Sequence, residues 1–377
     1  MKIPLSSPDI TEKEIESIVK VLRTPNLSLG PKLAEFETKF AEFIGTKYAV
    51  AVSSGTAGLH LCIKALKIEE GDGVITTPFS FITSSNCILY EGGNPAFVDI
   101  NRKTLCIDVD KIEKFIAKST NRTIKAILPV HIFGHPCEMD RIMEIADRYN
   151  LDVIEDGCEA IGAEYKNRST GSWGKVGTFG KCGVFSFYPN KPMTTGEGGM
   201  IVTDDEKLAQ ICSSLRNQGR EDSTHKRLGY NYRISDINSA LGIVQLERLD
   251  EILEKREKVA ELYNRKLKEV GEVELPYIGS NVKMGWFVYV VRLKANFSKE
   301  KRDEILDKLK DRGIECRSYF YPIHLQPFYM ENFGYKRGDF PTAEYISDRT
   351  IALPFHNNLK EEEIDYIVDN LLHAIKI

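Results

Sequence analysis

Residues 176–202 read VGTFGKCGVFSFYPNKPMTTGEGGMIV, and only Lys181, Lys191 and Glu197 among them are charged. Two apolar runs, GVFSF and GMIV, flank a turn signal at Tyr188-Pro189-Asn190 and a glycine-rich segment. The pattern predicts a strand, a tight turn and a second strand, with both strands buried. Lys191 follows the first strand, where burial favours the neutral amine that attacks carbonyl carbon. The ordinary alternative is a lysine that reaches out to water.

The overall composition is that of a soluble globular protein. A chain of 377 residues with 42% hydrophobic and 28% charged residues suits one large domain plus a smaller one. Its 51 basic and 55 acidic residues give a net charge of −4, and no basic run interleaved with aromatic residues indicates a nucleic-acid partner. No apolar run approaches the length of a signal peptide core or a membrane span. The eight cysteines form no C-x-x-C pair, so we expect a reducing, cytoplasmic location.

Apolar runs and amphipathic segments alternate through the first two thirds of the chain. Strand-like runs lie at residues 48–54, 73–79, 95–100, 123–133 and 151–156. Helix-like segments of ten to fifteen residues separate them, which predicts an α/β fold with a mainly parallel sheet covered on both faces. Ligands of such sheets bind beyond the carboxyl ends of the strands.

Helical segments precede this alternating region, and a second pattern follows it. A capping box at Thr11–Glu14 begins the first helix, and one long charge-rich helix is expected at residues 236–270. Beyond it we expect strands at 286–293 and 314–318 and helices at 299–312 and 361–375. These elements predict a large domain at residues 1–245, including the N-terminal helical segment, and a smaller α+β domain at residues 246–377.

The turn after the first predicted strand has the features of a phosphate site. Gly55 allows close approach of the backbone, and the amides of Thr56 and Ala57 open a helix toward an anion. Ser186, at the end of a later strand, can add a hydroxyl group. The alternative is a plain helix cap formed by Ser54 or Thr56.

Two further residues lie at predicted strand ends. Asp156 ends the run LDVIED, where a carboxylate can hold the proton of a pyridinium nitrogen, although it can also cap the next segment. Phe81 can stack on a planar ring, or belong to the core. An amine at Lys191, a carboxylate, a phosphate turn and an aromatic wall are together the requirements of pyridoxal phosphate.

Seven runs of sequence resemble the DegT/DnrJ/EryC1/StrS family of pyridoxal-phosphate-dependent aminotransferases, which act mainly on nucleotide-linked keto-sugars. They are SSGTAGLHL (53–61), TTPFSFITSSN (76–86), PVHIFGHP (129–136), VIEDGCEAIGA (153–163), FSFYPNKPMTTGEGGMIVTDD (185–205), GYNYRISDINSALGIVQLERLD (229–250) and YPIHLQPFY (321–329). The resemblance covers nearly the whole chain. It implies the aspartate-aminotransferase type of fold (fold type I) and a homodimer with active sites at the subunit interface.

The resemblance also implies roles for single residues. Lys191 matches the Schiff-base lysine and Asp156 the partner of the pyridine nitrogen. Cofactor contacts are implied for Gly55, Thr56, Ala57, Ser186 (phosphate), Phe81 (ring) and Asn231 (phosphate of the neighbouring subunit's cofactor). Glu159 stands where the family usually has Gln or His near the phenolic oxygen of the cofactor.

Substrate contacts are expected from Tyr188, Arg233, Arg317 and His324, the last of which can equally be a structural histidine. The expected reaction moves an amino group from L-glutamate to a nucleotide-linked 4-keto- or 3-keto-6-deoxy sugar, as in the biosynthesis of polysaccharides such as O-antigen. Alternatives are amination of a free ketocyclitol and a non-catalytic regulatory protein that retains the fold. His131 and His135 are four residues apart, but the Pro129–Gly134 context does not favour a helical metal site.

Overall fold

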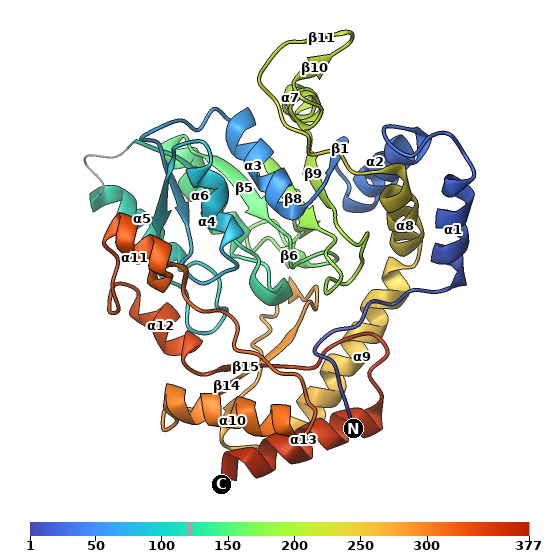
Figure 1. Cartoon of the computed structure of the whole chain (residues 1–377). Coiled ribbons are helices and arrows are strands. Elements are labelled where there is room, and N and C mark those ends of the chain that lie inside the picture. Colours follow the sequence, from blue (N-terminus) through green and yellow to red (C-terminus); the bar gives the residue numbers. More distant parts are fainter. Residues whose placement is uncertain (119–122, 377) are drawn as a thin grey trace.

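A seven-stranded sheet forms the centre of the larger part of the protein in the computed structural model, which describes residues 1–118 and 123–376 (Figure 1). The strand order is β1-β9-β8-β5-β4-β2-β3. Neighbours from β3 through β8 are parallel, whereas β9 is antiparallel to both β8 and β1, which confirms the predicted mainly parallel sheet. The strands are β1 Tyr48–Val52, β2 Gly73–Thr76, β3 Asn94–Phe97, β4 Ile124–Ile127, β5 Asp152–Asp156, β8 Cys182–Ser186 and β9 Gly199–Thr203.

The sheet is apolar on both faces because helices cover both. Val184 belongs to the apolar cluster that includes Leu59 of α3, whereas its neighbour Phe185 packs edge-on against Phe40 of α2, with ring centroids 5.4 Å apart. Successive residues of β8 therefore face opposite layers. The helices that precede, connect or follow these strands are α1 Glu12–Leu22, α2 Pro31–Ile44, α3 Gly55–Ala65, α4 Thr83–Leu89, α5 Val109–Lys118, α6 Met139–Tyr149 and α7 Glu206–Arg216.

Strands β8 and β9 bear out the two buried strands predicted at the centre of the chain, but the expected tight turn between them is wrong. Residues 187–198 form a longer connection, closed at its base by the Phe187 amide bonding to the Gly198 carbonyl at 3.0 Å. A turn in which the Lys191 amide bonds to the Tyr188 carbonyl lies inside this connection. The extra length matters, because it carries Lys191 back over the end of the sheet.

The predicted long helix at residues 236–270 is two helices, α8 (Asp236–Glu247) and α9 (Leu249–Leu267), which are separated at Arg248. Helix α8 packs on α1 and α2, while α9 buries Tyr263 in the core of the C-terminal part. The break lets each half bury its apolar side against a different core. Arg248 Nη1 donates to Glu14 Oε1 at 2.6 Å and Nη2 to Asp9 Oδ1 at 3.0 Å.

Replacing Arg248 with alanine is expected to lower the free energy of unfolding by about 3–5 kcal/mol, because buried Glu14 loses its cationic partner and Asp9 keeps only Lys255, at 3.3 Å. Asp9 and Glu14 are both buried. Thermal unfolding measures the change. Arg265 is exposed on α9, and Arg265→Ala serves as the control. It should change the free energy of unfolding by about 0.5 kcal/mol or less, so that its unfolding midpoint stays close to that of the parent. Equal midpoints for the two variants would refute the role of the Arg248 network.

The C-terminal part is built on a three-stranded antiparallel sheet of order β12-β14-β15. The predicted strand at 314–318 is wrong: Ile314 and Arg317 make only isolated bridges, to Ile3 and Ala352. The N-terminal residue Ile3 thus packs in this smaller core. The elements are β12 Val273–Glu274, β14 Tyr289–Leu293, α10 Lys299–Asp311, α11 Pro327–Phe333, α12 Pro341–Ser347, β15 Thr350–Leu353 and α13 Glu361–Lys376. The domain boundary between residues 245 and 246 stays a prediction and falls within α8.

Short elements complete the chain. A three-stranded antiparallel sheet has the order β13-β6-β7, and the β10–β11 hairpin projects from the top of the molecule in Figure 1. Their bounds are β6 Glu164–Lys166, β7 Trp173–Lys175, β10 Arg220–Glu221, β11 Thr224–His225 and β13 Val282–Lys283, with 3₁₀ turns at Ile132–Gly134 and Ile323–Leu325.

Candidate active site

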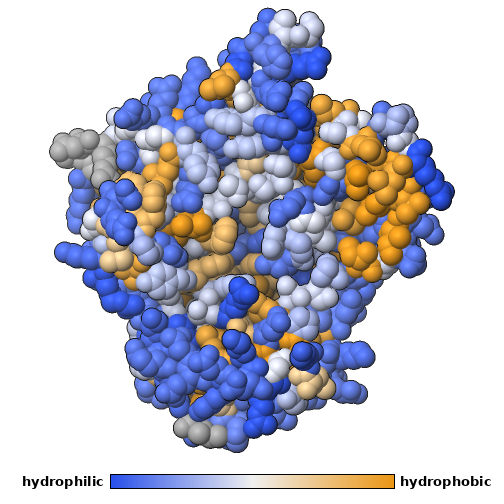
Figure 2. All heavy atoms as spheres, in the orientation of Figure 1, coloured by the Kyte–Doolittle hydropathy of each residue, from blue (hydrophilic) through white to orange (hydrophobic). Residues whose placement is uncertain are grey.

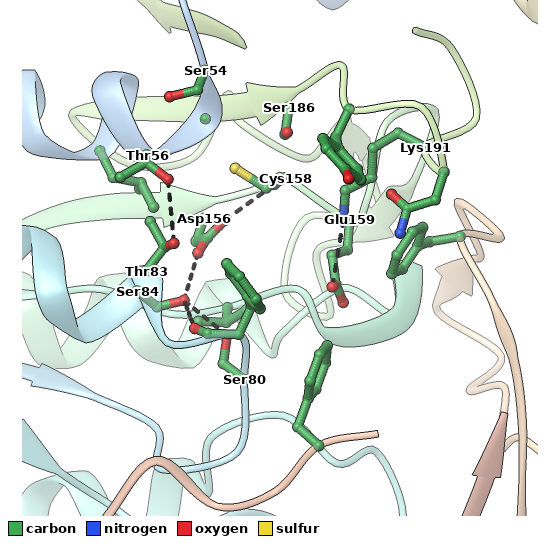
Figure 3. A pocket seen from close by; sticks show the side chains of 18 of the residues that line it. Ser54, Thr56, Ser80, Thr83, Ser84, Asp156, Cys158, Glu159, Ser186 and Lys191 are labelled. Carbon is green, nitrogen blue, oxygen red and sulfur yellow. Dashed lines mark hydrogen bonds and ion pairs between the residues drawn. The ribbon is translucent and has the colours of Figure 1, made fainter. Parts of the chain in front are cut away.

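A cavity of about 480 Å³ lies over the carboxyl ends of β5 and β8 (Figure 3). This is the position where ligands bind in parallel α/β sheets, and the volume is typical of a small-molecule site. The N-terminus of α3, the start of α4 and the β8–β9 connection form its walls, and the C-terminal part closes one side. The lining includes Ser54, Gly55, Thr56, Ser80, Phe81, Thr83, Ser84, Asp156, Cys158, Glu159, Ser186, Tyr188, Asn190, Lys191, Glu197, Phe287, Arg317, Tyr319 and Phe320.

The N-terminus of α3 forms one end of the cavity. Gly55 is required there, because a Cβ atom would lie 2.8 Å from Cys158 Sγ and 2.9 Å from Ser186 Cβ. Ser54 caps the helix by accepting the Ala57 amide at 3.1 Å. The predicted cap is therefore present beside the anion-binding features, and Ala57 is not among the lining residues, so its phosphate contact stays a prediction.

Hydroxyl groups surround this helix N-terminus. Thr56 Oγ1 lies 3.2 Å from Thr83 Oγ1 at the start of α4, and Ser186 faces them from the end of β8 (Figure 3). Backbone amides at a helix N-terminus together with several hydroxyl donors suit a phosphate group.

Asp156 lines the cavity at the end of β5 and is buried. Its Oδ2 accepts the Ser84 hydroxyl at 2.7 Å, and its Oδ1 accepts the Cys158 amide at 3.1 Å. Ser84 Oγ is in turn 2.8 Å from Ser80 Oγ. These contacts fix the orientation of the carboxylate, so that it can receive a cationic N–H group of a ligand.

Phe81 is 61% exposed although it lines a formed cavity. The alternative that it belongs to the core is therefore wrong. A large aromatic face left open to the cavity suits contact with a planar ring.

Lys191 turns inward from the β8–β9 connection, so the alternative that it reaches water is wrong. Its Nζ lies 3.6 Å from Glu159 Oε1 and 3.6 Å from the centre of the Phe287 ring, and its side chain is only 12% exposed. The Phe133 amide donates to Glu159 Oε2 at 3.0 Å. Burial raises the pKa of Glu159, although Lys191 acts in the opposite direction. The cavity thus holds an amine between a carboxylate and an aromatic face.

The C-terminal part supplies the remaining wall through Phe287, Arg317, Tyr319 and Phe320. Arg317 and Tyr188 were both expected to contact substrate, and both line the cavity. The other three were missed, since no local pattern marks them and only the packing of the two parts brings them here. Ser80 and Ser84 were missed as well, although their position four apart after a strand end offered a usable signal.

Three predicted residues do not line the cavity. His324 is fully buried and its Nε2 lies 3.0 Å from Glu344 Oε1, so the structural alternative is right and the expected pocket contact is wrong. Burial lowers the pKa of His324, against the influence of Glu344. Arg233 donates to Asn217 Oδ1 at 3.0 Å and lies outside the cavity lining. Asn231 is exposed, and its expected contact with a neighbouring subunit stays a prediction.

Comparison with known proteins matches this geometry. The DegT/DnrJ/EryC1/StrS aminotransferase family matches residues 8–372. The chain belongs to this family. It is 39% identical over 380 residues to GDP-perosamine synthase of Escherichia coli O157:H7. The aligned region covers 98% of this chain and 97% of that protein.

Solved structures agree. PseC of Helicobacter pylori, an aminotransferase involved in the biosynthesis of pseudoaminic acid, superimposes with a TM-score of 0.91 at 29% identity over the full length of both chains. The PLP-form of Spr1654 from Streptococcus pneumoniae gives a TM-score of 0.92 at 28% identity, covering 100% of this chain and 99% of that one. The protein is a pyridoxal-phosphate-dependent sugar aminotransferase with the type I fold, and the non-catalytic alternative is wrong.

Within residues 1–118 and 123–376, no three or more His, Cys, Asp or Glu side chains are grouped to hold a metal ion. None of the helices in the described part of the chain has both the length and the apolar character needed to cross a membrane.

Proposed function

We propose that this aminotransferase moves an amino group from L-glutamate to the ketone of a nucleotide-linked 4-keto- or 3-keto-6-deoxy sugar. The observation that supports this most is the convergence of the Lys191 amine, the Asp156 carboxylate and the Gly55 turn on one cavity. Two of the similar proteins bear names that refer to a GDP-linked amino sugar and to pseudoaminic acid.

Each residue has a distinct part in this proposal. Bound pyridoxal phosphate supplies an aldehyde and an electron-withdrawing ring that stabilises negative charge on the carbon that loses a proton. Lys191 would be the attachment point of the cofactor. Its free amine would take the proton from the donor Cα as general base and pass it to the C4′ carbon of the cofactor as general acid. Asp156 keeps the ring nitrogen protonated, because its carboxylate is buried and held by Ser84. Thr56 and Ser186 bind the phosphate, and Phe81 orients the ring.

The cavity wall contributed by the C-terminal part is suited to binding both substrates. Arg317 offers a guanidinium group that can bind a carboxylate of the donor in a bidentate manner. Tyr188 is half exposed at the same cavity and can contact the sugar. Arg233, which is expected to bind substrate but lies outside the cavity lining, would act only from a neighbouring subunit.

A homodimer is part of the proposal. Figure 2 shows an apolar patch in the region of α1 and α2. The exposed apolar side chains there include Ile15, Val19 and Leu22 of α1 and Leu27 and Leu29 of the segment that follows it. Exposed patches of this kind mark protein interfaces. Asn231 is exposed on the subunit surface, as a residue that completes a neighbour's phosphate site must be. The eight free cysteines support a reducing, cytoplasmic setting.

The substrate assignment predicts a strong preference for the nucleotide-linked ketone. Two charge-assisted hydrogen bonds to the diphosphate, at about 1.5 kcal/mol each, correspond to a kcat/KM about 100-fold higher than for the same sugar without the nucleotide. The protein is loaded with pyridoxal phosphate, and L-glutamate converts the cofactor to its amino form. This form is mixed with a nucleotide-linked keto-sugar, the free keto-sugar or a free ketocyclitol, and the return of the aldehyde-form absorbance is followed. Faster return of the absorbance with the ketocyclitol would contradict the assignment and favour the alternative substrate.

A further inference from the structure

Glu159 and Lys191 face each other inside the cavity as a buried pair. The carboxylate oxygen and the ammonium nitrogen are 3.6 Å apart, and the two side chains are 8% and 12% exposed. This separation exceeds a charge-assisted hydrogen bond by less than about 1 Å, so a small movement of the lysine brings the two groups into contact. Figure 3 shows both side chains pointing toward each other across the cavity.

The surroundings of Glu159 suit a group that takes up a proton. Burial, and to a smaller extent the nearby Asp156, raise the pKa of Glu159, whereas Lys191 and the Phe133 amide act in the opposite direction. The Phe133 amide holds one carboxylate oxygen and leaves the other toward Lys191. The other titratable and charged groups that line the cavity around the pair are Asp156, Cys158, Tyr188, Glu197, Arg317 and Tyr319.

Lys191 lies between a carboxylate and an aromatic ring. A carboxylate and the face of the Phe287 ring both lie 3.6 Å from its nitrogen. An ammonium group cannot attack a carbonyl carbon, so the proton must leave before the cofactor is attached. The nearest carboxylate oxygen that the structure gives to this amine is that of Glu159.

We propose that Glu159 is the internal base for Lys191, accepting its proton when the amine attacks the cofactor aldehyde and returning it when the lysine is released. One N–H bond of the ammonium breaks and one O–H bond forms on the carboxylate. The neutral amine then forms a carbon–nitrogen double bond to the aldehyde carbon, and the aldehyde oxygen leaves as water with the two remaining amine hydrogens. This inference rests on the proposed function in one respect, which is that Lys191 is the attachment point.

A proton that moves only between Lys191 and Glu159 gives the rate of cofactor attachment a distinctive pH dependence. While Glu159 and Lys191 together hold one proton, the fraction with a neutral amine and a neutral acid does not change with pH. With glutamine at position 159 the amine must release its proton to solvent, and the neutral fraction rises about tenfold per pH unit. The ratio of the attachment rates of Glu159→Gln and the parent is therefore expected to rise about tenfold per pH unit until the amine is neutral.

The experiment mixes cofactor-free, full-length protein with pyridoxal phosphate in a stopped-flow instrument and follows cofactor absorbance across the neutral pH range. Taking the ratio of rates cancels the ionisations of the cofactor itself. Glutamine keeps an oxygen for the Phe133 amide, and Glu159→Asp keeps the carboxylate, so the aspartate variant should follow the parent profile. Glu164→Gln is the matched control, because this carboxylate pairs with Lys283 at 3.0 Å outside the cavity.

The outcomes separate this inference from the proposed function. Reduction of the loaded protein with borohydride and peptide mass spectrometry locate the cofactor. If the cofactor is on Lys191 and the ratio of the attachment rates of Glu159→Gln and the parent rises with pH, the inference is supported. If the cofactor is on Lys191 and the attachment rates of Glu159→Gln and the parent have the same pH dependence, Glu159 is not the base and the proposed function stands. A cofactor on another lysine overturns both. If the glutamine variant does not fold, a profile for Glu159→Asp that is steeper than the parent's overturns the inference.

Discussion

Replacing Lys191 with alanine is expected to lower kcat by at least about 10⁴-fold, because the group that transfers the proton is lost together with the attachment point. The amine lies inside the cavity, 3.6 Å from Glu159, with no second lysine among the residues that line it. The cofactor absorbance should change from that of a lysine-bound to that of a free aldehyde, and borohydride should no longer fix the cofactor to the protein. Single-turnover kinetics with L-glutamate measures the loss.

Lys181→Ala is the matched control for this variant. Lys181 belongs to the same segment, and its amine pairs with Asp205 at 2.6 Å on the surface. Its removal is expected to leave kcat within about twofold of the parent and to change stability by no more than about 1 kcal/mol. Substantial turnover by the Lys191 variant, or an equal loss in both variants, would show that the proton is carried by another group.

Asp156→Asn is expected to lower kcat by about 100-fold to 1,000-fold, which corresponds to about 3–4 kcal/mol for the loss of a buried charge opposite a ring N–H group. The substitution keeps the size of the side chain and its hydrogen bond to the Cys158 amide. Cofactor affinity should fall as well, and fluorescence titration with pyridoxal phosphate measures it.

Ser84→Ala tests whether orientation of the Asp156 carboxylate matters in addition to its charge. The Ser84 hydroxyl is 2.7 Å from Asp156 Oδ2, and a hydrogen bond to a charged group contributes about 1.5–3 kcal/mol. We expect kcat for Ser84→Ala to lie between those of the parent and Asp156→Asn. If Asp156→Asn retained the parent kcat while Ser84→Ala lost activity, the carboxylate would have a structural role only.

Much of the site could be predicted because its residues lie at the ends of neighbouring strands. Asp156 ends β5 and Ser186 ends β8, while Gly55 and Thr56 follow β1. In a parallel sheet these ends meet at one edge, so residues far apart in the chain converge without any knowledge of side-chain packing. The family resemblance added the role of each residue.

The residues that escaped prediction depend on contacts between distant parts of the chain. His324 lies in an aromatic run typical of a substrate loop, yet it is bonded to Glu344 and fully buried. Phe287 and Tyr319 carry no local signal and reach the cavity only because the C-terminal part packs over it. The break between α8 and α9 likewise follows from the buried partners of Arg248, which are more than 230 residues earlier in the chain.

Local sequence thus specified the α/β alternation, the buried strands on either side of Lys191 and the chemistry of the strand ends, because periodicity and turn residues act over a few positions. Packing specified the direction of the side chains for which the sequence left two alternatives open. It turned Lys191 away from water toward Glu159, left Phe81 open to the cavity, and assigned His324 to the core. The physical reason is that burial and charge pairing are properties of the assembled layers, which no short segment contains.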